Sequence, residues 1–230
     1  SRVSDWLSCF DMGCGTGRWA ERVARRVGHL TCIDASPEAL EVARARLAPL
    51  PNVTIQRASV DALPLMDASQ DFGYSLGVLH HVPDPQAGLS ACIRKLKPSA
   101  PFLVYLYYRF DHRPAWYRAL WRISDVLRRG VSRLPFTPRV AVTNIMAGIV
   151  YWPFARLARA GARAGLEVSS WPLSAYASRS FYTMRTDALD RFGTRLERRF
   201  SRAEVHDLMR RAGLADIRFN ETAAFWTAVG

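Results

Sequence analysis

The chain has 230 residues, 49% of them hydrophobic, and its 32 Lys and Arg outnumber its 20 Asp and Glu to give a net charge of +12. This length and apolar content predict one large domain, or a domain with a substantial insertion, around a sizeable core. We recognise no signal peptide and expect no membrane span, because the best candidate, residues 140–155, is short and carries Thr143, Asn144 and Pro153.

The first hundred residues alternate between predicted strands and helices. Amphipathic stretches predict helices, two of which have Ser36 and Asp84 as N-caps. Strands that alternate with helices indicate a doubly wound α/β fold, in which a parallel sheet carries helices on both faces. Strands are expected at 8–13, 29–35, 52–58, 71–82 and 101–108, and helices at 17–28, 36–48 and 84–98.

The remainder of the chain divides into two parts. Residues 109–198 are predicted to be a mainly helical insertion, and a capping box of Ser201 and Glu204 then opens a final helix. Two strand-like runs follow with a short link, which favours an antiparallel pair. We therefore predict a core of residues 1–108 and 199–230, interrupted by a cap of residues 109–198 that recognises the substrate.

The positive charge is concentrated in this insertion. Residues 109–200 contain 17 Arg, no Lys and six acids, whereas the rest of the chain is close to neutral. Such a segment favours an anionic substrate, an anionic lipid surface or nucleic acid. Its apolar helix faces suit either a lid over the site or a peripheral contact with an anionic membrane, and we favour the lid.

The four cysteines show no CxxC pair and no other metal-ligand spacing. We therefore expect no bound metal, and we interpret the cysteines as buried free thiols in a reducing compartment, with a cytoplasmic location for the protein. They are Cys9, Cys14, Cys32 and Cys92.

The stretch FDMGCGTGRWA, residues 10–20, forms a glycine-rich turn between a predicted strand and a helix. This geometry places a nucleotide-like ligand over the start of the helix. The dinucleotide fingerprint G-x-G-x-x-G is absent, because Arg18 stands where its third glycine belongs. The pattern is instead Asp11 followed by glycines at every second position, Gly13, Gly15 and Gly17.

Two later elements narrow the choice of ligand. Asp34 ends the next strand, where a carboxylate can accept both ribose hydroxyls, and ASVDALP, residues 58–64, follows the third strand where adenine would lie. The Asp11 carboxylate would repel a phosphate but suits an ammonium group. An adenosine with a cationic amino-acid tail, S-adenosylmethionine, combines these features.

DMGCGTG, CIDASPEAL, ASVDALP and FGYSLGVLHHVPDP together resemble the successive motifs of class I S-adenosylmethionine-dependent methyltransferases that act on small molecules. The resemblance covers residues 9–108 and fits the end of the chain. It implies a Rossmann-like seven-stranded sheet of order 3-2-1-4-5-7-6 with strand 7 antiparallel. This family usually has a helix before the first strand, for which we expect no room in the eight residues present here.

The resemblance also implies roles for single residues. The turn residues Asp11, Gly13, Cys14, Gly15 and Gly17 would hold the methionine part of the cofactor. Asp34 would bind the ribose, and Ala35 would lie on the adenine. Ser59 departs from the acid or amide that the family has there, so Asp61 is a substitute for the adenine contact. The remaining cofactor contacts would come from Val60, Leu76 and Gly77.

The residues that would meet the acceptor follow from their places after the strands. His80 and His81 lie just past the fourth strand, where a general base belongs. The structural alternative is that both only cap the strand. Tyr108 ends the fifth strand and would line the pocket. An Arg and Tyr cluster late in the insertion would hold an anionic acceptor, unless it is simply a solvated surface: Tyr176, Arg179, Tyr182 and Arg185.

These motifs predict methyl transfer to a small-molecule acceptor, anionic or apolar in character. An RNA methyltransferase that grips phosphates with the basic insertion is an alternative, although the sequence has no recognisable RNA-binding module. A protein that binds the cofactor without catalysis is another, and an aminopropyltransferase is disfavoured because it would need an acidic pocket. DNA is excluded as a substrate, since the chain has neither an Asn-Pro-Pro-Tyr-type turn nor a Pro-Cys nucleophile.

Overall fold

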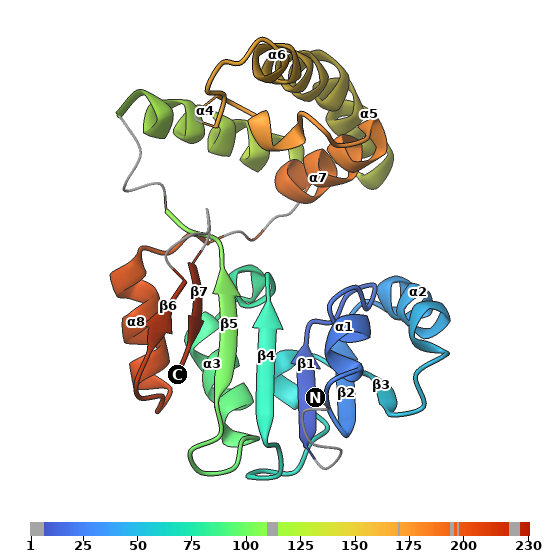
Figure 1. The fold of residues 1–230 in the computed structure, drawn as a ribbon, viewed down its shortest axis with the longest axis vertical. Helices are drawn as coiled ribbons and strands as arrows, with labels where there is room; N and C mark the ends of the chain where they lie inside the picture. Colours follow the sequence, from blue (N-terminus) through green and yellow to red (C-terminus); the bar gives the residue numbers. More distant parts are fainter. Residues whose placement is uncertain (1–6, 110–114, 170, 194–195, 197, 221–225) are drawn as a thin grey trace. The chain divides into compact units, whose positions relative to one another are not determined.

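The computed structural model describes residues 7–109, 115–169, 171–193, 196, 198–220 and 226–230. The chain forms two compact units, and Figure 1 shows the elements of each. The sheet unit consists of residues 1–111 and 198–230, and the helical unit consists of residues 112–197.

The sheet unit contains the predicted seven-stranded sheet, in the order β3-β2-β1-β4-β5-β7-β6. The first five strands pair in parallel, and β7 runs antiparallel to both β5 and β6. The predicted fold class and strand order are therefore confirmed. The strands are β1 (Ser8–Met12), β2 (His29–Asp34), β3 (Val53–Arg57), β4 (Phe72–Leu76), β5 (Phe102–Leu106), β6 (Arg218–Phe219) and β7 (Trp226–Val229).

Two hydrophobic cores lie on opposite faces of the sheet (Figure 1). The helices α1 (Ala20–Ala24) and α2 (Pro37–Leu47) cover one face, where Leu40 and Leu47 are buried. The helices α3 (Pro85–Arg94) and α8 (Arg202–Arg211) cover the other. This double covering explains why β1, β2 and β4 are buried along most of their length without alternation.

The predicted helix starts are confirmed by side-chain caps. The Ser36 hydroxyl accepts from the Ala39 amide, and the Asp84 carboxylate accepts from the Gln86 and Ala87 amides. Ser201 and Glu204 form the reciprocal capping box of α8. Each cap satisfies amides that have no partner within the helix.

Two predicted strands end earlier than their apolar patterns suggest. The strand predicted at 71–82 stops at Leu76, because Gly77 takes the left-handed conformation with φ +80° and Leu79–His81 then forms a 3₁₀ turn. The strand predicted at 101–108 stops at Leu106, and Tyr108 beyond it forms an isolated bridge to Phe200. Both endings place polar or aromatic side chains at the carboxyl edge of the sheet.

The helical unit consists mainly of four helices in the part that the structure describes. They are α4 (Ala115–Val131), α5 (Phe136–Met146), α6 (Trp152–Arg163) and α7 (Phe181–Gly193). A π turn, Ala147–Tyr151, joins α5 to α6, and a short 3₁₀ turn, Ser174–Tyr176, precedes α7. Its core is one cluster, made of Ala147, Tyr151, Ala155, Met184, Ala188 and Phe192.

The expectation that no segment is long enough to span a membrane is wrong. Helical structure continues from Phe136 to Arg163, which gives one helix of 28 residues that is long and apolar enough by length and composition alone. Pro153 does not end this helix, because the π turn lies immediately before it. Proline has no N–H to complete the regular helical hydrogen bond, and the wider π turn lets the backbone continue past it.

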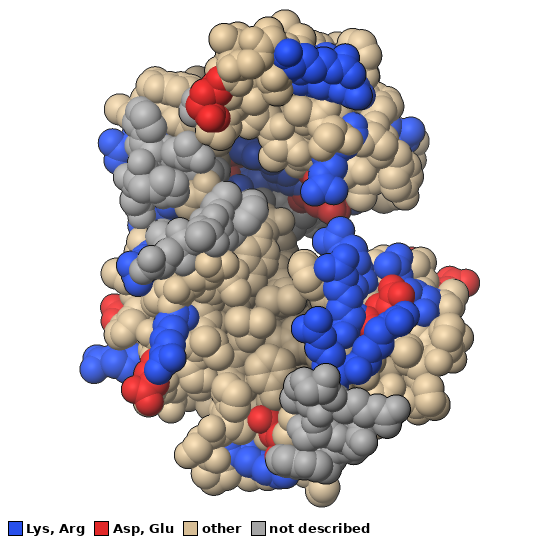
Figure 2. Space-filling model, viewed as in Figure 1, with Lys and Arg blue, Asp and Glu red and all other residues tan. Residues whose placement is uncertain are grey.

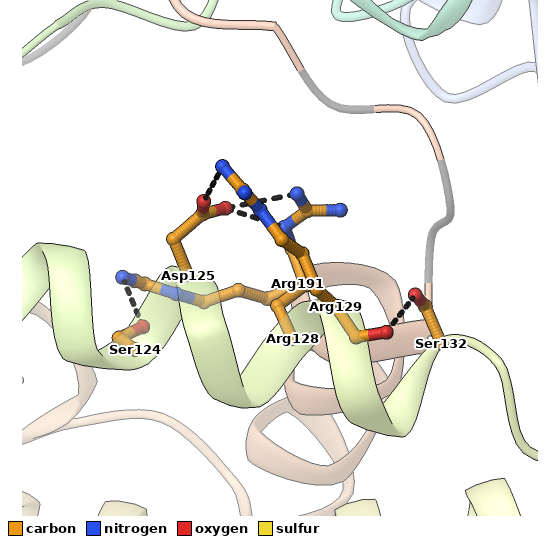
Figure 3. A network of polar contacts seen from close by, with 6 residues as sticks. All are labelled: Ser124, Asp125, Arg128, Arg129, Ser132 and Arg191. Atoms are coloured by element: carbon orange, nitrogen blue, oxygen red, sulfur yellow. Dashed lines mark hydrogen bonds and ion pairs between the residues drawn. The ribbon is translucent and has the colours of Figure 1, made fainter.

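A network of polar side chains ties α4 to α7 within the helical unit (Figure 3). The Asp125 carboxylate accepts from Arg128 and Arg129, each over 2.8 Å, and Arg191 of α7 donates to the Ser124 hydroxyl over 3.4 Å. One carboxylate thus pairs with two arginines and offsets one of their two positive charges.

Candidate functional site

The glycine turn links the end of β1 to α1 with backbone that only glycine adopts easily. Gly13, Gly15 and Gly17 all have positive φ, between +53° and +84°. A Cβ on Gly15 would meet no atom within 4 Å, so the middle of the turn presents open backbone. Open backbone at the carboxyl edge of a parallel sheet is where this fold binds ligands.

Asp34 ties the end of β2 to this turn. One carboxylate oxygen accepts from the Gly15 amide over 2.8 Å, and the other accepts from the Ser36 amide over 2.9 Å. The sequence predicts Asp34 only as a ribose ligand, and the contact with Gly15 was missed. The side chain is half-buried, so each oxygen keeps a lone pair for a ligand.

The loop after β4 packs against the same turn. A Cβ on Gly13 would lie 2.1 Å from a methyl group of Val78, so only glycine allows this approach. The Gly77 amide donates to the Tyr105 carbonyl over 3.0 Å, which fixes the loop that Leu76 enters. The carboxyl ends of β2, β1 and β4, neighbours in the sheet, therefore surround one site.

Asp11 lies near the end of β1 and is 2% exposed, and its Oδ2 atom accepts no hydrogen bond from the residues that the structure describes. Burial raises the pKa of its carboxyl to about 7, the nearby Tyr74 hydroxyl opposes the shift, and the charge of Asp34 adds to it. A buried carboxyl of this kind favours a cationic neighbour, because a positive charge would offset the cost of its ionisation.

The segment after β3 presents a mixed surface to the same edge. Val60 is buried in the core, so only its backbone can meet a ligand, whereas Ala35, Ser59 and Asp61 are exposed. A hydrogen bond from Ser59 lowers the pKa of the Asp61 carboxyl, which therefore stays charged near neutral pH. Ser59 thus helps to keep a charge on Asp61, the residue predicted to make the adenine contact in its place.

The two histidines after β4 have different environments. His80 is fully buried, and its ring stacks on Tyr107 with centroids 3.9 Å apart. Burial, with His81 and Arg199 as positive neighbours, lowers the pKa of His80 to about 2. Neither ring nitrogen of His80 has a hydrogen-bond partner in the described structure, whereas His81 is only half-buried. This geometry argues for His80 as a positioning residue and leaves His81 as the candidate base.

A cavity of about 530 Å³ lies between the first turn of α3 and α8 within the sheet unit. The Arg198 amide donates to the His80 carbonyl over 3.0 Å, so the cavity wall is joined to the histidine pair. The sequence analysis did not predict this cavity, although the run RRF, residues 198–200, lines it and has two adjacent basic residues. The charged residues that line it are Asp84, Arg109, Arg198, Arg199, Glu204, Asp207 and Arg211.

The predicted acceptor residues are divided between the two units. Tyr108 is buried in the sheet unit, and the other four belong to the helical unit. The Tyr176 ring lies on Tyr151 of that unit's core, and Arg185 donates to Asn144 over 2.8 Å. The other two are exposed, and in the described structure no hydrogen bond or ring contact joins any of Tyr176, Arg179, Tyr182 and Arg185 to another of them.

Comparison with known sequences finds a family match within the sheet unit. Residues 10–104 match the family described as a methyltransferase domain. The ubiquinone biosynthesis O-methyltransferase of Alkalilimnicola ehrlichii is 40% identical over 90 residues, which cover 38% of this chain and 36% of that protein. The chain spans between 27% and 39% of the length of such curated relatives.

Solved structures share the fold at low identity. A methyltransferase from Bacillus halodurans is 13% identical with a TM-score of 0.57, over 95% of this chain and 68% of that one. An S-adenosylmethionine-dependent methyltransferase from Thermotoga maritima is 18% identical with a TM-score of 0.55, over 97% of this chain and 81% of that one.

Proposed function

We propose that this chain, whose residues 10–104 match the methyltransferase-domain family, transfers the methyl group of S-adenosylmethionine to a small-molecule acceptor. Bound S-adenosylmethionine supplies a methyl group made electrophilic by a positively charged sulfur. The protein's own residues hold the two partners in line and remove a proton where the acceptor requires it.

The observation that carries the proposal is the cradle at the carboxyl ends of β1, β2 and β4. Its open Gly15 backbone admits a ligand, and the half-buried Asp34 carboxylate suits two ribose hydroxyls. The buried Asp11 carboxyl, with an Oδ2 atom that accepts no hydrogen bond, suits a cationic tail. These features fit S-adenosylmethionine and disfavour a pyrophosphate.

We infer that the acceptor atom is an oxygen, with His81 as the proton acceptor. Several curated relatives are ubiquinone biosynthesis O-methyltransferases, and a hydroxyl acceptor must lose a proton as its oxygen is methylated. His81 follows β4 at the edge where the cradle opens, and its half-buried ring is accessible to a proton. The buried His80 ring supports His81 from a centroid distance of 4.0 Å.

We infer further that the acceptor carries an anionic group that enters the cavity between α3 and α8. Arg109 is engaged there by Glu204 over 3.0 Å. Arg198 and Arg211 form no ion pair with another described residue, so their guanidinium groups remain available for a carboxylate or phosphate.

Calorimetric titration of the full chain with S-adenosylmethionine and S-adenosylhomocysteine tests the cofactor site. We expect micromolar binding that Asp34→Ala weakens on the order of a hundredfold, because two charge-assisted hydrogen bonds and the Gly15 anchor are lost. Asp67→Asn is the matched control, since Asp67 is an exposed carboxylate that pairs with Lys95. Equal binding by all three proteins would contradict the proposal.

Acceptor screening tests the chemistry once binding is established. Phenols with and without a carboxylate are compared for methyl transfer, and we expect the carboxylated member of each pair to react with the lower KM. Arg211→Gln should raise that KM by roughly tenfold and leave the neutral phenol unaffected. A KM that depends neither on the carboxylate of the acceptor nor on Arg211 would contradict the inference that the acceptor is anionic.

A further inference from the structure

One face of α4 exposes large apolar side chains to solvent. The apolar stripe of α4 consists of Trp116, Leu120, Ile123, Val126 and Leu127, which are between 49% and 67% exposed. Their spacing of three or four residues puts them on one side of the helix. Soluble proteins rarely expose so continuous a stripe unless it binds something.

The same unit exposes a second apolar surface along the helical stretch from Phe136 to Arg163. Only 22% of the most apolar part of this stretch is buried, so it is not a core helix. Its exposed large side chains are Phe136, Ile145, Ile149, Val150, Trp152, Phe154 and Leu157. The helical unit therefore presents more apolar surface than its six-residue core encloses.

Basic side chains accompany these apolar surfaces. On α4, Arg118, Arg122 and Arg129 are exposed and project beside the apolar stripe, along one flank of the helix. On α6, the Arg156 guanidinium lies 5.6 Å from the Trp152 ring. The unit has 14 Arg, no Lys and five acids, and Figure 2 shows basic side chains among uncharged ones on it.

Polar ties argue that α5 lies along an interface and does not cross it. Arg139 donates to the Gly193 carbonyl over 3.1 Å, and Arg185 donates to Asn144 over 2.8 Å. A spanning helix would carry these charged groups into hydrocarbon, which is costly. A helix in the interface keeps them at the level of the lipid headgroups.

We propose that the helical unit binds the surface of membranes that contain anionic lipid, with the apolar stripe of α4 inserted among the headgroups and acyl chains. The flanking arginines contact the anionic headgroups, so apolar burial and charge act together. The stripe alone would suit a second copy of the chain equally well, but nine net positive charges on each unit oppose that pairing.

Co-sedimentation of the full chain with vesicles tests this proposal, which does not depend on methyl transfer. The vesicles contain phosphatidylcholine alone or phosphatidylcholine mixed with phosphatidylglycerol. We expect binding only to the mixture, and a fall in binding as salt rises from about 0.1 M to about 1 M, where the Debye length shrinks from about 10 Å to about 3 Å. No binding to the mixture would overturn the proposal.

Three variants separate the lipid surface from other partners. Leu120→Ser with Ile123→Ser should reduce binding to the anionic vesicles by roughly tenfold or more, and Arg118→Gln with Arg122→Gln should reduce it as well, most strongly at low salt. Val42→Ser, at an exposed valine of the sheet unit, should change nothing. Vesicle binding that survives the double serine change, a concentration-dependent dimer that this change abolishes, or RNA that displaces the vesicles completely would each overturn it.

Discussion

The two units of this protein place their large apolar side chains in opposite ways. In the sheet unit, side chains such as Phe10, Leu40 and Phe102 are fully buried on one face of the sheet or the other. In the helical unit, three of the six core residues are alanines. Many of its large apolar side chains, such as Ile123, Phe136 and Ile149, are exposed to solvent. The first unit encloses its hydrophobic residues, whereas the second displays them.

Charge follows the same division. The sheet unit has 18 Lys and Arg against 15 acids, whereas the helical unit has 14 Arg against five acids. A nearly balanced charge suits a domain that binds small molecules at the carboxyl edge of its sheet. A basic, apolar surface suits contact with an extended anionic partner. The two proposals therefore fall on different units: methyl transfer on the sheet unit, and binding to a membrane surface on the helical unit.

The largest expected effect is a difference in stability between substitutions of a buried leucine in the sheet unit and an exposed leucine in the helical unit. Leu40→Ala removes a fully buried side chain between α2 and the sheet, so we expect a loss of about 2–5 kcal/mol in the free energy of unfolding. Leu120→Ser, on the exposed stripe of α4, should change stability by no more than about 0.5 kcal/mol. Urea unfolding measures both, and a comparable loss for Leu120→Ser would break the comparison.

The next effect sharpens the comparison within the sheet unit. Gly13→Ala forces a Cβ to within 2.1 Å of Val78 at a residue with φ +84°, so we expect a loss of about 2–3 kcal/mol and impaired cofactor binding. Gly15→Ala meets no atom within 4 Å, so only the cost of its left-handed backbone remains, about 1 kcal/mol. Equal losses would show that the Val78 contact does not hold the turn.

The helix caps were predictable from local signals, whereas the strand order was predicted from the resemblance of four successive motifs to class I S-adenosylmethionine-dependent methyltransferases. Ser36 and Asp84 stand directly before their helices, and the motif order carries the strand order. Strand ends were less predictable: the apolar run continues through Gly77, and only its positive φ stops β4. Likewise, Pro153 indicated a break that the π turn removes.

The candidate site was predictable in its backbone and not in its side-chain partners. The pattern of glycines identifies the turn, but the bond from Gly15 to Asp34 joins residues 19 positions apart. His80 stacks on Tyr107, which follows β5, and its carbonyl accepts from the amide of Arg198, more than a hundred residues further along the chain. Such contacts are set by tertiary packing, which a single sequence leaves open.

A third prediction separates the two neighbouring histidines. His81→Ala should lower kcat by about a hundredfold at neutral pH, because it removes the proposed proton acceptor. His80→Ala should lower stability and affect kcat less, since His80 is buried and its lowered pKa keeps it neutral. Steady-state kinetics paired with thermal unfolding distinguishes them, and a reversed pattern would assign the base to His80.

The smallest expected effect is a pH dependence at Asp11. Its carboxyl pKa is about 7 in the folded protein against about 4 in an unfolded chain, so the folded state holds its proton more tightly. Its contribution to stability is therefore complete below about pH 4 and is lost as the pH rises to about 7. Asp11→Asn removes this titration, so urea unfolding should show a shallower decline in stability between these pH values. Asp67, whose pKa is lowered by Lys95, provides the control of opposite sign. Parallel curves for wild type and Asp11→Asn would mean that Asp11 is already ionised when the site is empty, and the sheet unit would then hold a fixed negative charge beneath its cradle.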